Sequence, residues 1–108
     1  MHVIVTGRHF GVSDELKTLV TSKLEKLTRF YDRVESIEAV LDREGEVPMV
    51  EALVNAEHGV RLTARASGVD LYAALDLVVE KLTKQLTRHK ERLRNRKHQV
   101  RTDKTLEA

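Results

Sequence analysis

At 108 residues the chain has the length of one small domain, and its lack of cysteine excludes disulfide bonds, a thiolate nucleophile and cysteine-bound zinc. The formal net charge is only +2, but residues 81–104 hold ten Lys or Arg against two acidic residues, whereas the rest holds nine basic and fifteen acidic residues. No apolar run is long enough for a transmembrane helix, and the N-terminal residues become polar too early for a signal peptide. We therefore expect a soluble cytoplasmic domain whose basic C-terminal end favours nucleic acid as a partner.

The first third of the chain is predicted to form a strand and then a helix. Residues 2–7 are rich in β-branched side chains and end at Gly7, which is typical of a strand. Ser13 stands where a helix N-cap is expected, and two acidic residues follow it in the first turn. Apolar residues then recur at helical spacing and predict a helix over about 14–31: Leu16, Val20, Leu24, Leu27 and Tyr31.

From residue 35 onward the apolar period changes to two. Three segments alternate between apolar and polar residues: 35–41, 49–56 and 60–67. Gly45 and Pro48 mark the first connection, and His58 with Gly59 supplies a two-residue hairpin loop in which Gly59 can take a positive φ. This pattern predicts three antiparallel strands with one apolar face and one polar face.

Asp70 is the expected N-cap of a second helix. Seven residues of this helix share one arc of about 80° on the helical wheel: Leu71, Leu75, Val78, Leu82, Leu86, His89 and Leu93. We therefore predict a packed helix to about residue 96 that closes a domain over 1–96, and a frayed or disordered basic tail over 97–108. The order β-α-β-β-β-α predicts an α+β two-layer sandwich, with both helices on one face of a four-stranded sheet.

A second arc of the same helix carries only positive charge. It also spans about 80°, lies beside the apolar arc, and consists of Lys81, Lys84, Arg88 and Arg92. Its length of roughly 16 Å would follow two or three phosphates of a nucleic-acid strand. Lys90 belongs to a looser basic patch on another side. The alternative is an ordinary solvated helix, although such helices usually mix both signs of charge.

Lys23 is unusual because it falls inside the apolar arc of the first helix. One interpretation is that its stem packs while its amine reaches solvent at the helix edge. The other is that this edge is a groove between the two helices. Lys23 and Lys26 would then join the basic arc in holding a nucleic-acid backbone, and Arg33 would extend it.

The sequence gives little support for catalysis. Its five histidines are scattered, and it contains no Gly-rich phosphate loop, metal-ligand spacing or nucleophile motif. We therefore predict no catalytic residue, no metal and no cofactor. The four Phe and Tyr residues are too few to suggest stacking platforms, so binding is expected to depend on the phosphate backbone rather than on base sequence.

Three separated motifs carry a resemblance to a known family. They read VTGRHFGVSDEL at 5–16, VTSKLEKLTRFYDR at 20–33 and GVDLYAALDLVVEKLTKQLTRHKERL at 68–93. With them the chain resembles, over about residues 1–95, the short form of the ribosome hibernation-promoting factors, which are also described as ribosome-associated inhibitors. Long members carry a further C-terminal dimerisation domain, which we do not expect in this chain.

The resemblance implies a fold akin to double-stranded RNA-binding domains and a non-catalytic role. Such a protein would dock on the small ribosomal subunit, in the channel of mRNA and tRNA, and silence translation in starved or stationary-phase cells. It would be monomeric off the ribosome and would need neither a membrane nor a small-molecule substrate. The basic positions of the family carry over to eight residues, which we predict to bind RNA: Lys23, Lys26, Arg33, Lys81, Lys84, Arg88, Lys90 and Arg92.

A different class of function is also compatible with the basic helix. Members of the family have been described as modulators of an alternative sigma factor, which suggests a regulatory protein–protein module. An acidic protein partner would use the same positive arc as RNA, so the arc alone does not discriminate between the two hypotheses. A test of whether binding depends on the ribosome discriminates between the RNA-binding and the protein-binding hypotheses.

Overall fold

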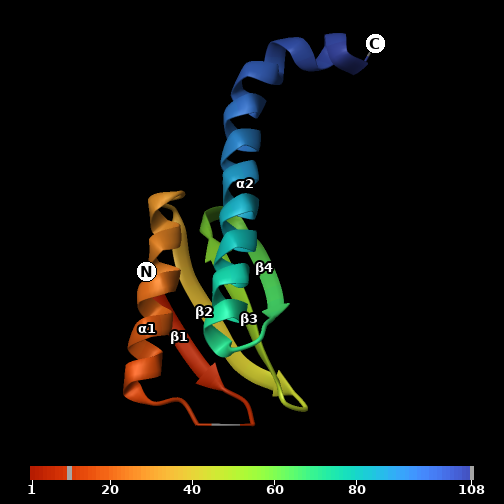
Figure 1. The fold of residues 1–108 in the computed structure, drawn as a ribbon. Coiled ribbons are helices and arrows are strands. Elements are labelled where there is room, and N and C mark those ends of the chain that lie inside the picture. The colour runs from red at the N-terminus through yellow and green to blue at the C-terminus, as the bar shows by residue number, and fades with distance from the viewer. Residues whose placement is uncertain (10, 108) are drawn as a thin grey trace.

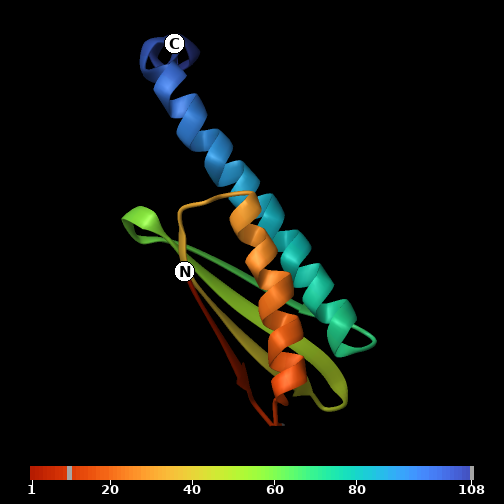
Figure 2. The ribbon, with the colours of Figure 1, turned by 90° about the vertical axis from the view of Figure 1, so that its left-hand side faces the viewer.

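The structure is a computed structural model that describes the backbone of residues 1–9 and 11–107 and the side chains of residues 1–9 and 11–94. Both helices cover one face of a four-stranded sheet and leave the other face open (Figures 1 and 2). This confirms the predicted α+β sandwich with the order β-α-β-β-β-α. The elements are β1 (His2–Gly7), α1 (Asp14–Glu25), β2 (Val34–Glu44), β3 (Val47–Ala56), β4 (Val60–Ser67) and α2 (Leu71–Glu107).

The strands lie in the sheet in the order β1-β2-β3-β4. β1 runs parallel to β2, with Val3 opposite Ile37, so the chain returns through α1 as a crossover. The other neighbours are antiparallel and are joined by tight turns. Gly45 and Gly59 have φ angles of 62° and 74°, the left-handed conformation that glycine adopts without steric cost. The positive φ predicted at Gly59 is thereby confirmed, but the loop is a three-residue 3₁₀ turn over Glu57–Gly59 rather than the predicted two-residue loop.

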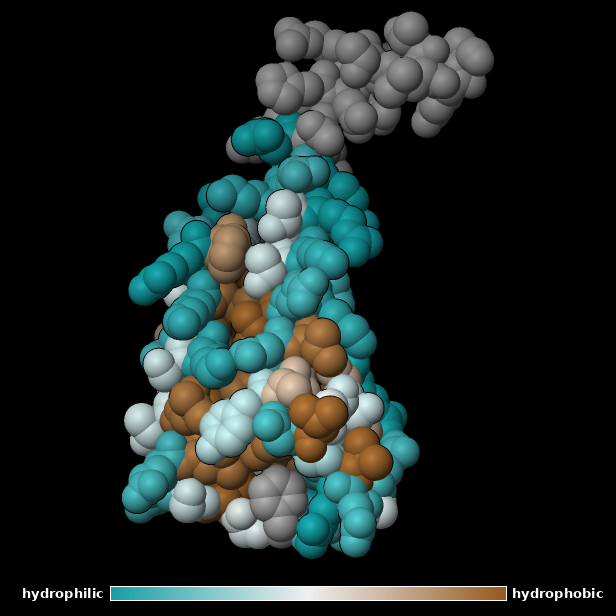
Figure 3. Space-filling view, in the orientation of Figure 1, coloured by the Kyte–Doolittle hydropathy of each residue, from teal (hydrophilic) through white to brown (hydrophobic). Residues whose placement is uncertain are grey.

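The core lies between the sheet and the two helices. Val20 and Leu24 of α1 and Leu75, Leu82 and Leu86 of α2 are almost fully buried. They pack with the inward-facing strand residues in one cluster, as the helical period of 3.6 and the strand period of 2 predict. Figure 3 shows apolar side chains gathered between α1 and the N-terminal part of α2, and hydrophilic ones around the next part of α2, before the residues drawn in grey.

Both predicted helix starts are confirmed by hydrogen bonds. The Leu16 N–H donates to Ser13 Oγ at 3.1 Å, and the Ala73 N–H donates to Asp70 Oδ1 at 2.8 Å. The helix ends differ from the prediction. α1 ends at Glu25 and tightens into a 3₁₀ turn over Lys26–Arg29, a common way for the last carbonyls of a helix to find partners.

α2 continues to Glu107, beyond the end at about 96 that its apolar stripe predicts. Leu93 is the last member of that stripe, and it is only partly buried against the core. The side chains of residues 95–108 lie outside the described part of the chain. The division into a domain over 1–96 and a basic tail over 97–108 therefore stays a prediction.

A close backbone approach explains the glycine before α2. A Cβ atom added at Gly68 would lie 2.8 Å from the Ala74 nitrogen and 3.0 Å from Ala73 Cβ, both in the first turn of the helix. We expect Gly68→Ala to lower the free energy of unfolding by roughly 1–3 kcal/mol, the usual cost of overpacking. Urea denaturation measures this difference through the midpoint. Gly11→Ala is the matched control, because a Cβ there meets nothing within 4 Å, and it should change stability by less than about 0.5 kcal/mol.

Asp42 is the one buried charged residue among the residues whose side chains are described. Its carboxylate accepts a hydrogen bond from His9 Nδ1 at 2.7 Å and another from the Arg43 N–H at 2.7 Å, and Arg8 lies 3.6 Å away. The contact with His9, then that with the Arg43 amide, holds the pKa of Asp42 below its ordinary value. This cluster ties the segment after β1 to the far half of β2.

The lowered pKa of Asp42 predicts a pH-dependent contribution to stability. The contribution is present above the ordinary aspartate pKa of about 3.9 and is lost as the pH falls through the lowered value. Asp42→Asn should therefore destabilise the protein near pH 6, and the difference from the wild type should shrink as the pH falls from the ordinary aspartate pKa through the lowered one. Urea midpoints over this range measure it. Glu46→Gln, at an exposed turn position, is the control. A difference that stays constant with pH would mean that Asp42 acts only through packing.

Candidate nucleic-acid interface

The basic arc predicted on α2 lies on the surface. Lys81, Lys84, Arg88 and Arg92 are all exposed, as is Lys90 on its separate side of the helix. The apolar arc beside them is buried against the sheet, so the angle between the two arcs fixes the direction in which the basic side chains point. The four cations of the arc nevertheless differ in what they contact.

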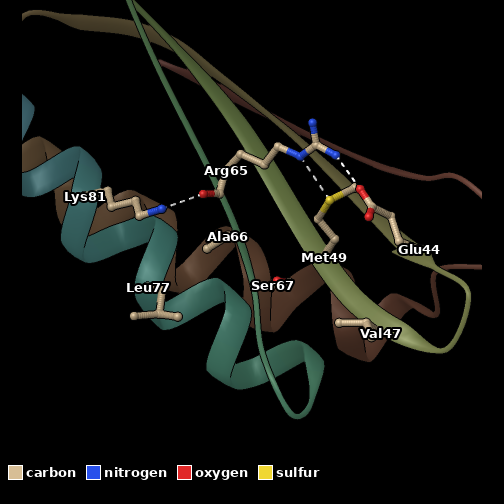
Figure 4. A pocket seen from close by; sticks show the side chains of 8 residues that line it. All are labelled: Glu44, Val47, Met49, Arg65, Ala66, Ser67, Leu77 and Lys81. Carbon is tan, nitrogen blue, oxygen red and sulfur yellow. Dashed lines mark hydrogen bonds and ion pairs between the residues drawn. The ribbon is translucent and has the colours of Figure 1, made fainter.

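Lys81 makes a contact that the sequence did not indicate. Its Nζ donates a hydrogen bond of 2.7 Å to the carbonyl of Arg65 in β4 (Figure 4). One turn further along α2, Gln85 Nε2 donates to the carbonyl of Thr63, also at 2.7 Å. Four helical residues rise about 6 Å and two strand residues about 6.6 Å, so the two side chains match alternate carbonyls of the strand. Together they cover part of the free edge of β4.

The remaining cations of the arc become less restrained toward the C-terminal end. Lys84 lies 3.4 Å from Glu80 in an exposed pair one helical turn apart, a contact worth only about 0.3–0.5 kcal/mol. Arg88 and Arg92 make no ion pair or hydrogen bond with any other residue whose side chain is described. Their charge is therefore available to an external anion.

Lys23 lies between the two helices, as the groove interpretation predicts, but its amine is not free. Lys23 Nζ donates to Asp76 Oδ1 of α2 at 2.6 Å. Asp76 is itself exposed, so this ion pair lies at the surface. Lys26, in the 3₁₀ turn after α1, is exposed and has no ion pair within the described residues.

Arg33 contacts Glu57, which lines the same hollow as Arg92. Arg33 Nη1 donates to Glu57 Oε1 at 2.6 Å, and this hydrogen bond raises the pKa of the guanidinium further. Glu57 and Arg92 both line a hollow of about 400 Å³ between α2 and the β3–β4 hairpin. His58 also lines this hollow, and its Nε2 lies 3.4 Å from Glu57 Oε1.

The floor of this corner is formed by two rings. Tyr31 is buried, and its ring meets that of His89 edge to face at a centroid distance of 5.3 Å. Burial first, and then the charge of Glu57, raises the pKa of the Tyr31 hydroxyl. The partly buried His89 thus packs at the rim of the core, as its place in the apolar arc suggested.

The open face of the sheet is a poorer candidate for binding a polyanion. Glu38 and Glu51 are exposed on its two central strands. No ion pair with a described residue neutralises either carboxylate. Arg61 and Arg65 stand on β4 at one edge, and Arg65 is bound to Glu44 at 2.7 Å. Uncompensated negative charge in the middle of this face would repel phosphates.

Within the described part of the chain, no group of three or more His, Asp or Glu residues is placed to hold a metal ion. None of its helices is both long and apolar enough to cross a membrane.

Sequence reasoning located the cations but missed their internal partners. Gln85 could have been noticed, because it follows Lys81 by one helical turn. The pairing of Lys23 with Asp76, and of Arg33 with Glu57, joins residues 53 and 24 positions apart. Neither pair has a local signal in the sequence.

Comparisons with known proteins agree on one family. The family model described as "Sigma 54 modulation protein / S30EA ribosomal protein" matches residues 3–94. The ribosome hibernation promoting factor of Escherichia coli (strain K12) is 34% identical over 94 residues, which are 87% of this chain and 98% of the relative. That of Azotobacter vinelandii is 35% identical over 92 residues, 85% of each chain.

Solved structures agree with these relatives. A ribosomal subunit interface protein from Coxiella burnetii superposes with a TM-score of 0.77 at 28% identity, over 84% of this chain and 99% of that one. The N-terminal domain of Protein Y from Thermus thermophilus gives a TM-score of 0.74 at 30% identity, over 82% and 99%. Matching sequence motifs, the same fold and coverage from residue 3 to residue 94 lead to one conclusion: the chain belongs to the Sigma 54 modulation protein / S30EA ribosomal protein family, the family of the ribosome hibernation promoting factors.

Proposed function

We propose that this protein is a cytoplasmic ribosome hibernation factor that binds the small ribosomal subunit in the channel of mRNA and tRNA. Occupying that channel would silence translation under starvation or in stationary phase. Family membership and the names of the relatives support the ribosome as partner. The observation that carries the mechanism is the exposed basic arc of α2, whose C-terminal members Arg88 and Arg92 are not neutralised by any residue with a described side chain.

The mechanism needs no catalysis and no cofactor. Guanidinium and ammonium groups bind phosphate oxygens by charge-assisted hydrogen bonds, and they release counterions from the RNA as they do so. A rigid helix presents these groups without first having to be ordered, so less entropy is lost on binding. A protein held in this way would exclude mRNA and tRNA sterically, and occupancy alone would stop initiation.

The internal contacts rank the eight proposed RNA-binding residues. Lys26, Arg88, Lys90 and Arg92 have no internal ion pair among the described side chains and would bind phosphate directly. Lys84 would exchange its weak pair with Glu80 at little cost. Lys23, Lys81 and Arg33 would first have to leave hydrogen bonds of 2.6–2.7 Å. We therefore expect the C-terminal part of the arc to contribute most of the affinity.

Charge reversal on the two faces tests the proposed surface. Arg88→Glu should lower the association constant for small subunits about tenfold at low salt and reduce the salt dependence by about one phosphate contact. Arg61→Glu makes the same change of charge on the open face of the sheet and should leave binding nearly unchanged. Co-sedimentation of the purified variants with 30S and 70S particles, at low and raised salt, measures both. A loss confined to Arg61→Glu would mean that the sheet is the contact surface.

The same experiment separates the proposed function from a regulatory protein–protein module. Co-migration with 30S particles that weakens with salt supports phosphate-dominated binding to the ribosome. A wild-type protein that stays at the top of the gradient even at low salt would contradict it. The acidic protein partner expected for sigma-factor modulation would then be the function to pursue.

A further inference from the structure

The hollow between α2 and the β3–β4 hairpin lies next to the proposed phosphate-binding residues. It has a volume of about 400 Å³, and its lining includes Tyr31, Glu57, Val60, Leu62, Arg92 and Leu93. Arg92 thus belongs both to the basic arc and to the rim of the hollow. An RNA strand bound along Arg88 and Arg92 would pass directly over its opening.

Three apolar residues form part of the wall of the hollow, beside the polar and aromatic side chains that complete it. Val60, Leu62 and Leu93 pack against the core on one side and are only partly buried, so each leaves apolar surface open toward the hollow. Binding sites for small planar groups combine such walls with a few fixed polar groups that set orientation. The volume is ample for one nucleobase but not for a stretch of double helix.

Two polar groups of the lining have unused hydrogen-bonding capacity. Both contacts of Glu57, with Arg33 and with His58, reach Oε1, and no described residue donates a hydrogen bond to Oε2. Arg33 also offsets the charge of this carboxylate, which lowers its repulsion of RNA. The buried Tyr31 hydroxyl is the only buried side-chain polar atom among the described residues that lacks a hydrogen-bond partner. Such a group is costly to leave unsatisfied.

We propose that this hollow accepts one unpaired base of the RNA whose backbone lies on Arg88 and Arg92. The inference rests on the proposed function and adds a base contact to it, which the low aromatic content of the sequence did not suggest. The apolar walls take the faces of the base, and Glu57 Oε2 accepts a hydrogen bond from its edge. Adenine, cytosine and guanine carry an exocyclic amino group that can donate this bond, whereas uracil offers only its ring N3–H, which stands between two carbonyl oxygens that the carboxylate repels.

Oligonucleotides of equal length and charge test the base contact. We expect single-stranded oligomers of adenylate or cytidylate to bind about fivefold to tenfold more tightly than an oligomer of stable abasic residues, within the range of one well-packed base. The affinity of oligouridylate should lie between the affinity of these oligomers and that of the abasic oligomer. All should show the same salt dependence, because the phosphate contacts are unchanged. Equal affinity of the abasic and base-bearing oligomers would overturn the inference.

Two variants locate the contact in the hollow. Leu62→Phe, which fills the hollow, should remove the preference for base-bearing oligomers and weaken binding to 30S particles by a similar factor. Leu53→Phe is the matched control, because Leu53 is a partly buried leucine on the open face of the sheet. Glu57→Gln keeps the size of the side chain, but the amide of glutamine can also donate a hydrogen bond to a carbonyl oxygen of uracil. This variant should therefore narrow the difference in affinity between oligoadenylate and oligouridylate.

The possible failures can be told apart. If Leu62→Phe and Glu57→Gln, with unchanged thermal unfolding, bind 30S particles and oligomers like the wild type, the hollow takes no base, while the phosphate-binding function stands. If Arg88→Glu also leaves 30S binding unchanged, the proposed surface itself is wrong.

Discussion

The packing of α2 on the sheet is the constraint on which the candidate interface depends. Leu75, Val78, Leu82 and Leu86 are at most 1% exposed, and burial of each such side chain contributes about 1.5–3 kcal/mol. Rotating the helix by one residue would bring this stripe toward water, so the core fixes the helix about its own axis. The basic arc lies at a constant angle from the buried one. The directions of Arg88 and Arg92 are therefore decided by apolar residues that bind no ligand.

The cations of this surface differ in the internal groups that accept their hydrogen bonds, and they therefore differ in the charge they offer to a ligand. The carboxylates of Asp76 and Glu80 offset the charges of Lys23 and Lys84, which lowers the local potential. Lys81 differs because its acceptor is a neutral carbonyl, so its charge still adds to the field while its amine covers the edge of β4. One lysine thus serves the sheet edge and the basic surface at once. The highest uncompensated charge lies further along α2.

Local patterns were sufficient for the fold but not for the details of the site. The periods of 2 and 3.6, the caps at Ser13 and Asp70 and the turn at Gly59 each depend on neighbouring residues, and each was predicted. The bond from Lys81 to the carbonyl of Arg65 depends on the register between a helix and a strand, which no short segment encodes. The hollow likewise needs α2, the residues before β2 and a hairpin to meet. Contacts between distant elements were accordingly the ones that sequence reasoning missed.

Charge and shape would contribute to binding in physically different ways. Phosphate contacts position a protein on RNA without reading its sequence. They weaken as the salt concentration rises, because the release of counterions from the RNA then gains less free energy. Burial of a base in an apolar hollow depends far less on ionic strength, because it removes apolar surface from water. As the salt concentration rises, the hollow would supply a growing share of the remaining affinity. A surface that combines Arg88 and Arg92 with the hollow beside them would thus find RNA through its charge and choose its register through one base.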